Sequence, residues 1–196
     1  MKLILASTSP YRKTLLEKLK IPFTCSRPNV DESPKNREPA RDLVERLARS
    51  KAQAVGTGIP KAYVIGSDQV ASLDDKILGK PGNYDIAFAQ LKAASGRAVT
   101  FHTGLCIFDT NTNTYHSTVE DFVVSFKSLS DEQITRYLHA EQPYDCAGSF
   151  KSEGLGIMLF SALNGRDPNT LVGLPLIRLT ELFTELGIDL FEHIRA

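Results

Sequence analysis

The chain of 196 residues lacks a net charge, because 23 lysines and arginines balance 23 aspartates and glutamates. A protein that grips a long nucleic acid through bulk charge is strongly basic, and a disordered tail is commonly charged in one sense. We therefore expect no nucleic-acid partner. With 42% hydrophobic and 23% charged residues, the composition is that of an ordinary globular protein, and the length suits a single domain over residues 1–196.

Cysteines are few, and long apolar runs are missing. Cys25, Cys106 and Cys146 are odd in number, far apart and outside any CxxC pattern, which argues against a disulfide framework or a structural zinc site. No stretch approaches the length of a membrane span, and the apolar run at residues 1–6 is too short for a signal peptide. We expect a cytoplasmic protein with no membrane partner.

The zero total charge is not uniform along the chain. Residues 1–51 carry 12 basic against 6 acidic residues, and the remainder carries 11 against 17. Cations gathered in one segment suggest a compact anionic ligand. The alternative is that helix faces near the N-terminus are solvated by lysine and arginine.

The order of apolar patterns predicts an α/β protein with a mixed, twisted sheet and flanking helices on both faces. Strands are expected at residues 3–6, 23–25, 63–66, 98–108, 115–126 and 155–160, with a hairpin over 70–78 that turns at Asp74-Asp75. Helices are expected from Pro10 onward and at residues 38–55, 84–94, 130–140 and 170–186. We find no readable boundary between domains.

The first candidate site is the segment that follows the first expected strand. Hydroxyls at Ser7 and Ser9 precede Pro10, which suits the first position of a helix, and Arg12 and Lys13 follow. Unpaired N–H groups and the dipole at a helix N-terminus attract anions, so this junction could bind phosphate. A well-capped helix with surface cations is the alternative. The phosphate-binding loop GxxxxGK[ST] is absent from the chain.

Two acidic segments are candidates for holding a hard cation. Asp68 lies where we expect a buried strand to end, and ligands of open α/β sheets bind beyond the carboxyl ends of strands. Glu32, in a polar loop, could add a second carboxylate, and Mg²⁺ commonly takes one or two carboxylates together with substrate phosphates. A turn cap and an ordinary surface acid are the alternatives. Lys51 and Lys80 are unremarkable by themselves.

Taken together, short motifs along nearly the whole chain resemble the Maf family of nucleotide pyrophosphatases. Their order and spacing carry the likeness more than any single motif. They are Ser7-Thr-Ser-Pro10-Tyr-Arg12-Lys, Val30-Asp31-Glu32, Ala48-Arg-Ser-Lys51-Ala52, Gly66-Ser-Asp68, Leu78-Gly-Lys80-Pro81, Ser95-Gly96, Thr103-Gly104, Ala147-Gly148-Ser-Phe150, Gly154 and Asn169-Thr-Leu-Val-Gly173-Leu-Pro175.

The resemblance implies a Maf/HAM1-like α/β fold with two lobes around a central groove. It also implies hydrolysis of a nucleoside triphosphate to the monophosphate and pyrophosphate, dependent on Mg²⁺ or Mn²⁺, and a possible homodimer. By the same resemblance, Asp68 accepts the proton of the attacking water, and Glu32 and Asp68 hold the metal. The phosphate-binding positions would be Ser7, Ser9, Arg12, Lys13, Lys51 and Lys80.

Three positions concern the choice of base. Tyr11, Gln69 and Glu153 depart from the residues of the thymidine and uridine triphosphate branch and are similar to those of the branch that acts on 7-methyl-GTP. N7-methylguanine is cationic, so stacking on Tyr11 gains a cation–π contribution, and the Glu153 carboxylate could accept two hydrogen bonds from guanine. Activity on dTTP, UTP or inosine-type nucleotides is the alternative within the family. Outside it, a nucleotide-binding regulator of cell division remains open.

Overall fold

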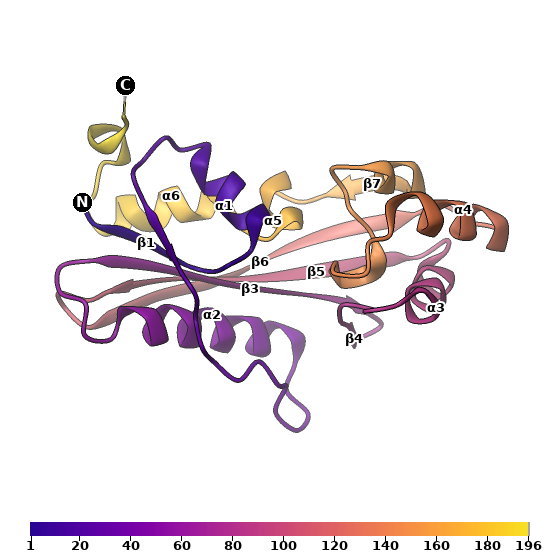
Figure 1. The fold of residues 1–196 in the computed structure, drawn as a ribbon, viewed down its shortest axis with the longest axis horizontal. Helices are drawn as coiled ribbons and strands as arrows, with labels where there is room; N and C mark the ends of the chain where they lie inside the picture. The colour runs from indigo at the N-terminus through magenta and orange to yellow at the C-terminus, as the bar shows by residue number, and fades with distance from the viewer. Residues whose placement is uncertain (196) are drawn as a thin grey trace. The chain divides into compact units, whose positions relative to one another are not determined.

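In the computed structural model, which describes residues 1–195, seven strands form one mixed sheet (Figure 1). Their order is β2-β1-β3-β5-β6-β7, and β4 pairs with β3. The strands are β1 (Leu3–Ala6), β2 (Thr24–Ser26), β3 (Tyr63–Leu73), β4 (Lys76–Leu78), β5 (Ala98–Asp109), β6 (Thr114–Phe126) and β7 (Phe160–Asn164). This confirms the predicted mixed sheet.

The helices begin where the sequence supplies caps. Ser9 caps the first helix with Pro10 at its start, and Ser130 and Gln133 form the reciprocal capping box of α4. Within residues 1–195, no helix is long and apolar enough to cross a membrane. The helices are α1 (Pro10–Glu17), α2 (Ala40–Gly56), α3 (Tyr84–Ala94), α4 (Asp131–Glu141), α5 (Pro168–Val172) and α6 (Leu176–Glu185), with short 3₁₀ turns η1 (Ala147–Ser149), η2 (Leu155–Leu159) and η3 (Leu190–His193).

The chain forms two compact units built from separated segments. Unit 1 comprises Met1–Asp68, Thr103–Glu120 and the segment from Asp167 onward, and unit 2 comprises Gln69–His102 and Asp121–Arg166. The chain passes from one unit to the other within β3, and the segments of each unit are not contiguous. This is why no linker is readable in the sequence. The single domain over residues 1–196 stays a prediction.

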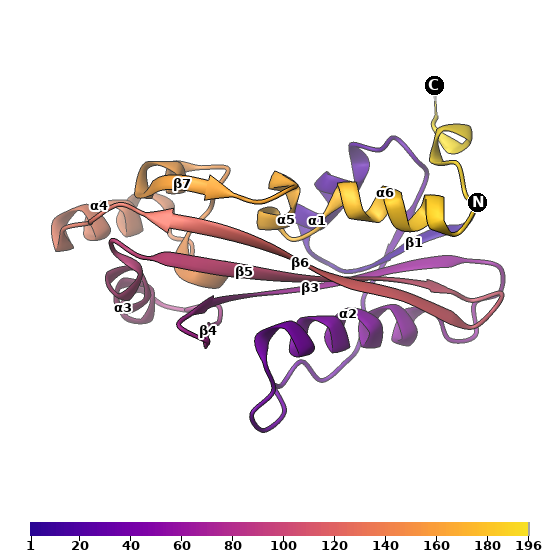
Figure 2. The same ribbon diagram turned by 180° about the vertical axis from the view of Figure 1, so that it is seen from behind.

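Unit 1 has helices on both faces of its strands, as predicted. The α2 helix covers one face, and α1 and α6 cover the other (Figures 1 and 2). The β1 strand serves both cores, because alternate side chains of a strand point to opposite faces. Leu3 and Leu5 join the cluster that contains the apolar side chains of α1 and α6, whereas Ile4 and Ala6 join the cluster of α2. Burial on both faces explains the continuous apolar run.

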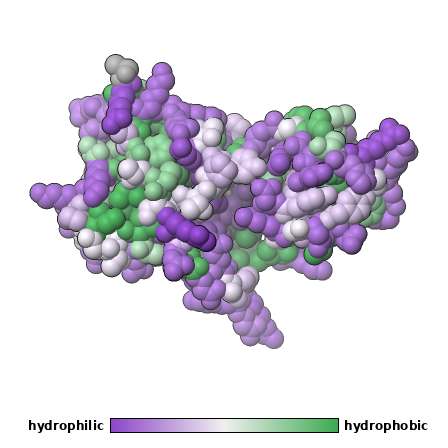
Figure 3. Space-filling model, viewed as in Figure 1, coloured by the Kyte–Doolittle hydropathy of each residue, from purple (hydrophilic) through white to green (hydrophobic). Residues whose placement is uncertain are grey.

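Unit 2 is held by a cluster of aromatic rings. Phe150 makes edge-to-face contacts with Phe101, Phe126 and Phe160 at centroid distances of 5.2, 5.6 and 4.7 Å. The hairpin of β3 and β4 turns at Asp74-Asp75, as predicted. Apolar side chains also reach the surface of this unit (Figure 3), where Met158 is 66% exposed.

Two predicted elements after residue 150 are wrong. The strand expected at 155–160 is a 3₁₀ turn over Leu155–Leu159, followed by β7, because the N–H groups of Gly154 and Gly156 both turn back to the carbonyl of Lys151. The single helix expected at 170–186 is two helices. Gly173 ends α5 in the left-handed conformation, with φ of 110°, and Pro175 then precedes α6.

Candidate active site

The centre of the candidate site is a buried ammonium group shared by two carboxylates. The Lys51 Nζ atom donates to Asp68 Oδ1 at 2.6 Å and lies 2.8 Å from Glu32 Oε1. Lys51 is 5% exposed and Asp68 is 7% exposed, so this pair is shielded from water, whereas the Glu32 side chain reaches solvent. Three residues predicted from separate motifs thus meet at one point.

A glycine allows this meeting. A Cβ atom at Gly66 would lie 2.1 Å from the carbonyl oxygen of Ala48 and 2.8 Å from the nitrogen of Ala52, so the backbone of α2 rests directly on β3. Gly66 and Asp68 share one face of the strand because they are two residues apart. Lys51 precedes Ala52 on the helix, and the close packing brings its side chain to Asp68.

The prediction that Asp68 follows the end of a strand is wrong, since β3 continues to Leu73. The polar residues of this segment suggested an end because they would be costly to bury alone. Each has a partner instead: the Ser67 hydroxyl donates to the carbonyl of Gly173 at 3.0 Å, and Asp68 accepts from Lys51. A satisfied polar pair can remain inside a strand.

The side chain of Arg12 is held by a backbone group near the C-terminal end of the chain. Its Nε atom donates to the carbonyl oxygen of Gly173 at 2.8 Å, and a Cβ atom at that glycine would lie 3.4 Å from Arg12 Nε. Burial lowers the pKa of the Arg12 guanidinium, while the charges of Asp68 and Glu32 act in the opposite direction. The Arg12 guanidinium therefore interacts electrostatically with the carboxylates of Asp68 and Glu32. Its phosphate-binding role stays a prediction.

The start of α1 carries the predicted hydroxyls. Ser7 is buried, and its Oγ accepts from the N–H of Ser9 at 3.1 Å. The Oγ of Ser9 accepts from the N–H of Arg12 at 3.4 Å, which confirms its role as a cap. β1 and β3 are parallel and pair as far as Leu5 and Ile65. Ser7 and Asp68 both follow shortly after this pairing in the chain, so they lie at the same end of it. Tyr11 is half-buried on the first turn of α1.

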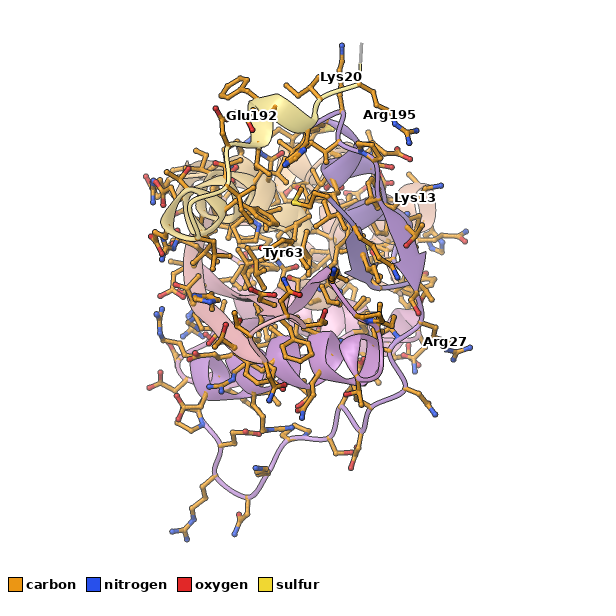
Figure 4. The ribbon with its side chains drawn as sticks, turned by 90° about the vertical axis from the view of Figure 1, so that its left-hand side faces the viewer. Lys13, Lys20, Arg27, Tyr63, Glu192 and Arg195 are labelled. Atoms are coloured by element: carbon orange, nitrogen blue, oxygen red, sulfur yellow. The ribbon has the colours of Figure 1, made fainter. Side chains whose placement is uncertain are left out.

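Lys13 points elsewhere. Its side chain is largely exposed and lies 3.7 Å from Glu17 on the next turn of α1. With Lys20 and Arg195 it lines a pocket of about 760 Å³, and the three cations lie along one side of unit 1 (Figure 4). The structure brings Ser7, Ser9, Arg12, Glu32, Lys51 and Asp68 into one region of unit 1 but directs Lys13 to this pocket. Its phosphate-binding role stays a prediction.

The remaining candidates belong to unit 2. Gln69 lies on β3, half-buried, and Lys80 is exposed in the turn between β4 and α3, where Gln90 donates to the carbonyl of Gly79 at 3.2 Å. Glu153 is exposed, and its Oε2 accepts from the hydroxyl of Ser152 at 2.6 Å. Their predicted roles stay predictions.

The sequence did not predict a chain of hydrogen bonds that links three side chains of unit 2. Ser72 Oγ lies 2.9 Å from His102 Nε2, and His102 Nδ1 lies 2.8 Å from Asp121 Oδ1. An ionised carboxylate only accepts, so Nδ1 donates to Asp121. In the neutral imidazole, Nε2 then accepts from the Ser72 hydroxyl. Ser72 is buried near the end of β3, opposite Ile77 of β4, and the three residues come from β3, β5 and β6. We interpret the chain as a bond between strands, which no local sequence pattern would reveal.

The residues that could hold a divalent cation are Glu32 and Asp68. No group of three or more histidine, cysteine or acidic side chains in the described chain is arranged to hold a metal ion. The two carboxylates nevertheless converge on one ammonium nitrogen, and their hard oxygens match the one or two carboxylates by which Mg²⁺ is commonly held beside substrate phosphates.

Comparison with known sequences agrees with the motifs. A family model described as Maf-like protein matches residues 2–186. Proteins named 7-methyl-GTP pyrophosphatase are 61% identical in Pseudoalteromonas atlantica over 100% of both chains, and 57% identical in Colwellia psychrerythraea over 95% of this chain and 94% of that protein. The relative of that name from Nitrosococcus oceani is 55% identical over 94% and 93%.

Two solved structures share the fold. The Ham1 protein of Staphylococcus aureus has a TM-score of 0.54 at 11% identity, covering 96% of this chain and 100% of that chain. The HAM1 protein of Coxiella burnetii has a TM-score of 0.52 at 14% identity, covering 94% and 99%. At such low identity the likeness concerns the fold alone, and it confirms the predicted fold class.

Proposed function

Because the chain belongs to the Maf family, we propose that it is a nucleoside triphosphate pyrophosphatase that hydrolyses 7-methyl-GTP to 7-methyl-GMP and diphosphate. The cluster of Lys51, Asp68 and Glu32 carries the proposal for the reaction. The printed names of three relatives at 55–61% identity support the choice of substrate.

In the proposed reaction, Asp68 accepts a proton from the water that attacks the α-phosphorus, and diphosphate leaves. The Lys51 ammonium donates to the Asp68 carboxylate and thereby orients it. Arg12 and the hydroxyls of Ser7 and Ser9 donate to phosphate oxygens, and Lys13 and Lys80 are assigned to phosphate by family resemblance alone. Phosphoryl transfer depends mainly on such positioning and charge stabilisation.

A divalent cation, Mg²⁺ or Mn²⁺, held by Glu32 and Asp68 would neutralise the charge of the phosphates. Lys51 lies between these two carboxylates. Its ammonium group balances part of their negative charge.

For recognition of the base, we assign stacking to Tyr11 and hydrogen-bond acceptance to Glu153, with Gln69 as a further contact. A cationic N7-methylguanine favours both an aromatic face and a carboxylate. Such an enzyme would remove a modified nucleotide from the cytoplasmic pool before polymerases use it.

The test is a substrate panel of 7-methyl-GTP, GTP, ITP, UTP and dTTP with release of diphosphate as the readout, with Mg²⁺, with Mn²⁺ and with chelator. We expect 7-methyl-GTP to have the highest kcat/KM and chelator to abolish turnover. If UTP or dTTP is cleaved at least as efficiently, the substrate assignment is wrong. Binding of nucleotide without metal-dependent turnover would favour the regulator instead.

Two substitutions test the residue roles. Asp68→Asn should abolish turnover in a folded protein, whereas Asp75→Asn, the same change in the exposed turn of the β3–β4 hairpin, should not. Glu153→Gln should reduce the preference for 7-methyl-GTP over GTP. Full activity of Asp68→Asn would remove it from the role of base.

A further inference from the structure

The loop that carries Glu153 is closed on itself. The N–H groups of Gly154 and Gly156 both lie near the carbonyl oxygen of Lys151, at 3.4 and 3.1 Å. A Cβ atom at Gly156 would lie 2.2 Å from that oxygen, so only glycine fits there. Glu153 projects from this turn into solvent.

Two side chains of α4 hold the loop on either side of Glu153. The Tyr137 hydroxyl oxygen accepts from the N–H of Lys151 at 3.1 Å, and Glu141 Oε2 accepts from the N–H of Leu155 at 2.8 Å. The two side chains share one face of the helix because they are four residues apart. Glu153 therefore lies between two anchored backbone groups.

The Glu141 carboxylate also forms the surface on which the loop packs. A Cβ atom at Gly154 would lie 2.7 Å from Glu141 Oε2, and Lys151 Nζ lies 3.8 Å from Glu141 Oε1. The Glu141 side chain is 18% exposed. Burial raises the pKa of the Tyr137 hydroxyl, so this second anchor stays neutral.

The negative charge of Glu141 does not stabilise α4. Glu141 is the last residue of α4, where the helix dipole disfavours a negative charge. The backbone donor of Leu155 and the ammonium of Lys151 offset that cost, and both belong to the loop.

We propose that Glu141 is a positioning residue that fixes Glu153 for recognition of the base, with Tyr137 as its companion. This inference rests on the proposed function, because it makes the preference for 7-methyl-GTP depend on a residue that does not touch the nucleotide. A loop that is ordered before binding loses less conformational entropy when the substrate arrives.

The experiment compares Glu141→Ala and Glu141→Gln with the wild-type protein. We expect Glu141→Ala to raise KM for 7-methyl-GTP about tenfold with kcat nearly unchanged, since the lost contact serves binding of the base. The amide oxygen of Glu141→Gln can still accept from Leu155, so it should restore most of the preference. Glu132→Ala is the matched control, because Glu132 is an exposed acid at the other end of α4, paired with Arg136.

A second readout is independent of turnover. Hydrogen exchange of the Leu155 amide should accelerate in Glu141→Ala, and exchange of the Lys151 amide should accelerate in Tyr137→Phe, while the melting temperature stays within a few degrees of wild type. Unchanged exchange, or an unchanged ratio of kcat/KM for 7-methyl-GTP and GTP in folded Glu141→Ala, would overturn the inference.

Failure of the proposed function gives a different pattern. If the wild-type protein does not prefer 7-methyl-GTP, the proposed function itself is wrong. The role of Glu141 in base recognition is then wrong as well. If the wild type has this preference and Glu153→Gln loses it, but Glu141→Ala keeps it, only the positioning role is refuted.

Discussion

The ammonium nitrogen of Lys51 lies 2.6 Å from Asp68 Oδ1, although the two residues are 17 positions apart in the sequence. The same nitrogen lies 2.8 Å from Glu32 Oε1. One cation thus holds a buried carboxylate and a solvent-facing carboxylate together. Removal of any member takes away a charged partner of the others.

Lys51→Met should therefore damage both stability and turnover. Methionine fills a similar volume but leaves the buried Asp68 without its cation, and breaking a buried pair in this way costs about 3 kcal/mol. Urea unfolding measures the loss of stability, and release of diphosphate measures turnover. Arg136→Met, which breaks an exposed pair with Glu132, should change the unfolding free energy by less than about 1 kcal/mol. Equal stability of both variants would contradict the importance of the buried pair.

Gly66→Ala should separate α2 from β3. The added Cβ atom would lie 2.1 Å from the carbonyl oxygen of Ala48, which is backbone and cannot rotate away. We expect a loss of about 2 kcal/mol of unfolding free energy from this overpacking. Because the shift moves Lys51 from Asp68, turnover should fall as well.

The matched control for this substitution is Gly79→Ala. The two variants are compared in stability only. A Cβ atom at Gly79 would have nothing within 4 Å, so its melting temperature should remain near that of the wild type. A fully stable Gly66→Ala protein would show that the helix and strand can separate without cost.

Acid should loosen the loop that carries Glu32. Glu38 accepts from Arg46 Nε at 2.6 Å and from Arg46 Nη2 at 2.7 Å, and these hydrogen bonds lower the pKa of Glu38 to about 2. Arg46 also donates to the carbonyl of Ser33, next to Glu32. The pair contributes stability above the ordinary glutamate pKa of about 4.5, and that contribution is lost as the pH falls toward about 2.

Urea midpoints measured from pH 5 to pH 2.5 test this dependence. Glu38→Gln should be less stable than wild type at pH 5 and should approach it at the lowest pH, because the wild type loses its carboxylate there. Glu17→Gln, an exposed change on α1, serves as the control. A constant difference between wild type and Glu38→Gln across the range would be inconsistent with the lowered pKa.

The three thiols should differ in reactivity. Burial raises the pKa of the Cys106 and Cys146 thiols to about 12, so almost no thiolate forms at pH 8, whereas Cys25 is exposed on β2. A disulfide reagent at pH 8 should modify one thiol rapidly in the native protein and three after denaturation. Cys25→Ser should abolish the rapid phase; its persistence would contradict the assignment.

Elements with a strong local signal were predictable from the sequence. The helix over Tyr84–Ala94 and the start of α1 at Pro10 match their predictions, because caps and turns act over a few residues. The helix predicted over residues 170–186 failed where its apolar pattern crosses Gly173, which takes a left-handed conformation. The apolar periodicity shows which face of a helix is buried, but it does not show where one helix ends and the next begins.

For the site, family resemblance supplied the residues, and their arrangement came from packing. Arg12 depends on a carbonyl group 161 residues away, at Gly173, and Lys51 depends on the missing Cβ atom of Gly66. Neither contact has a local signature. The predicted strand end at Asp68 was wrong for the same reason, since its partner on α2 was not visible in the strand's own sequence.

By itself, the sequence determined the α/β class, the caps and the β3–β4 hairpin turn, because these follow from short-range periodicity and side-chain chemistry. Its resemblance to the Maf family supplied the candidate site residues. Only the tertiary structure decided which of those residues meet. It joined Lys51 to two carboxylates, directed Lys13 to a different pocket and clamped the Glu153 loop between Tyr137 and Glu141. Such contacts link positions distant in the chain, and they arise when buried polar groups find partners during packing.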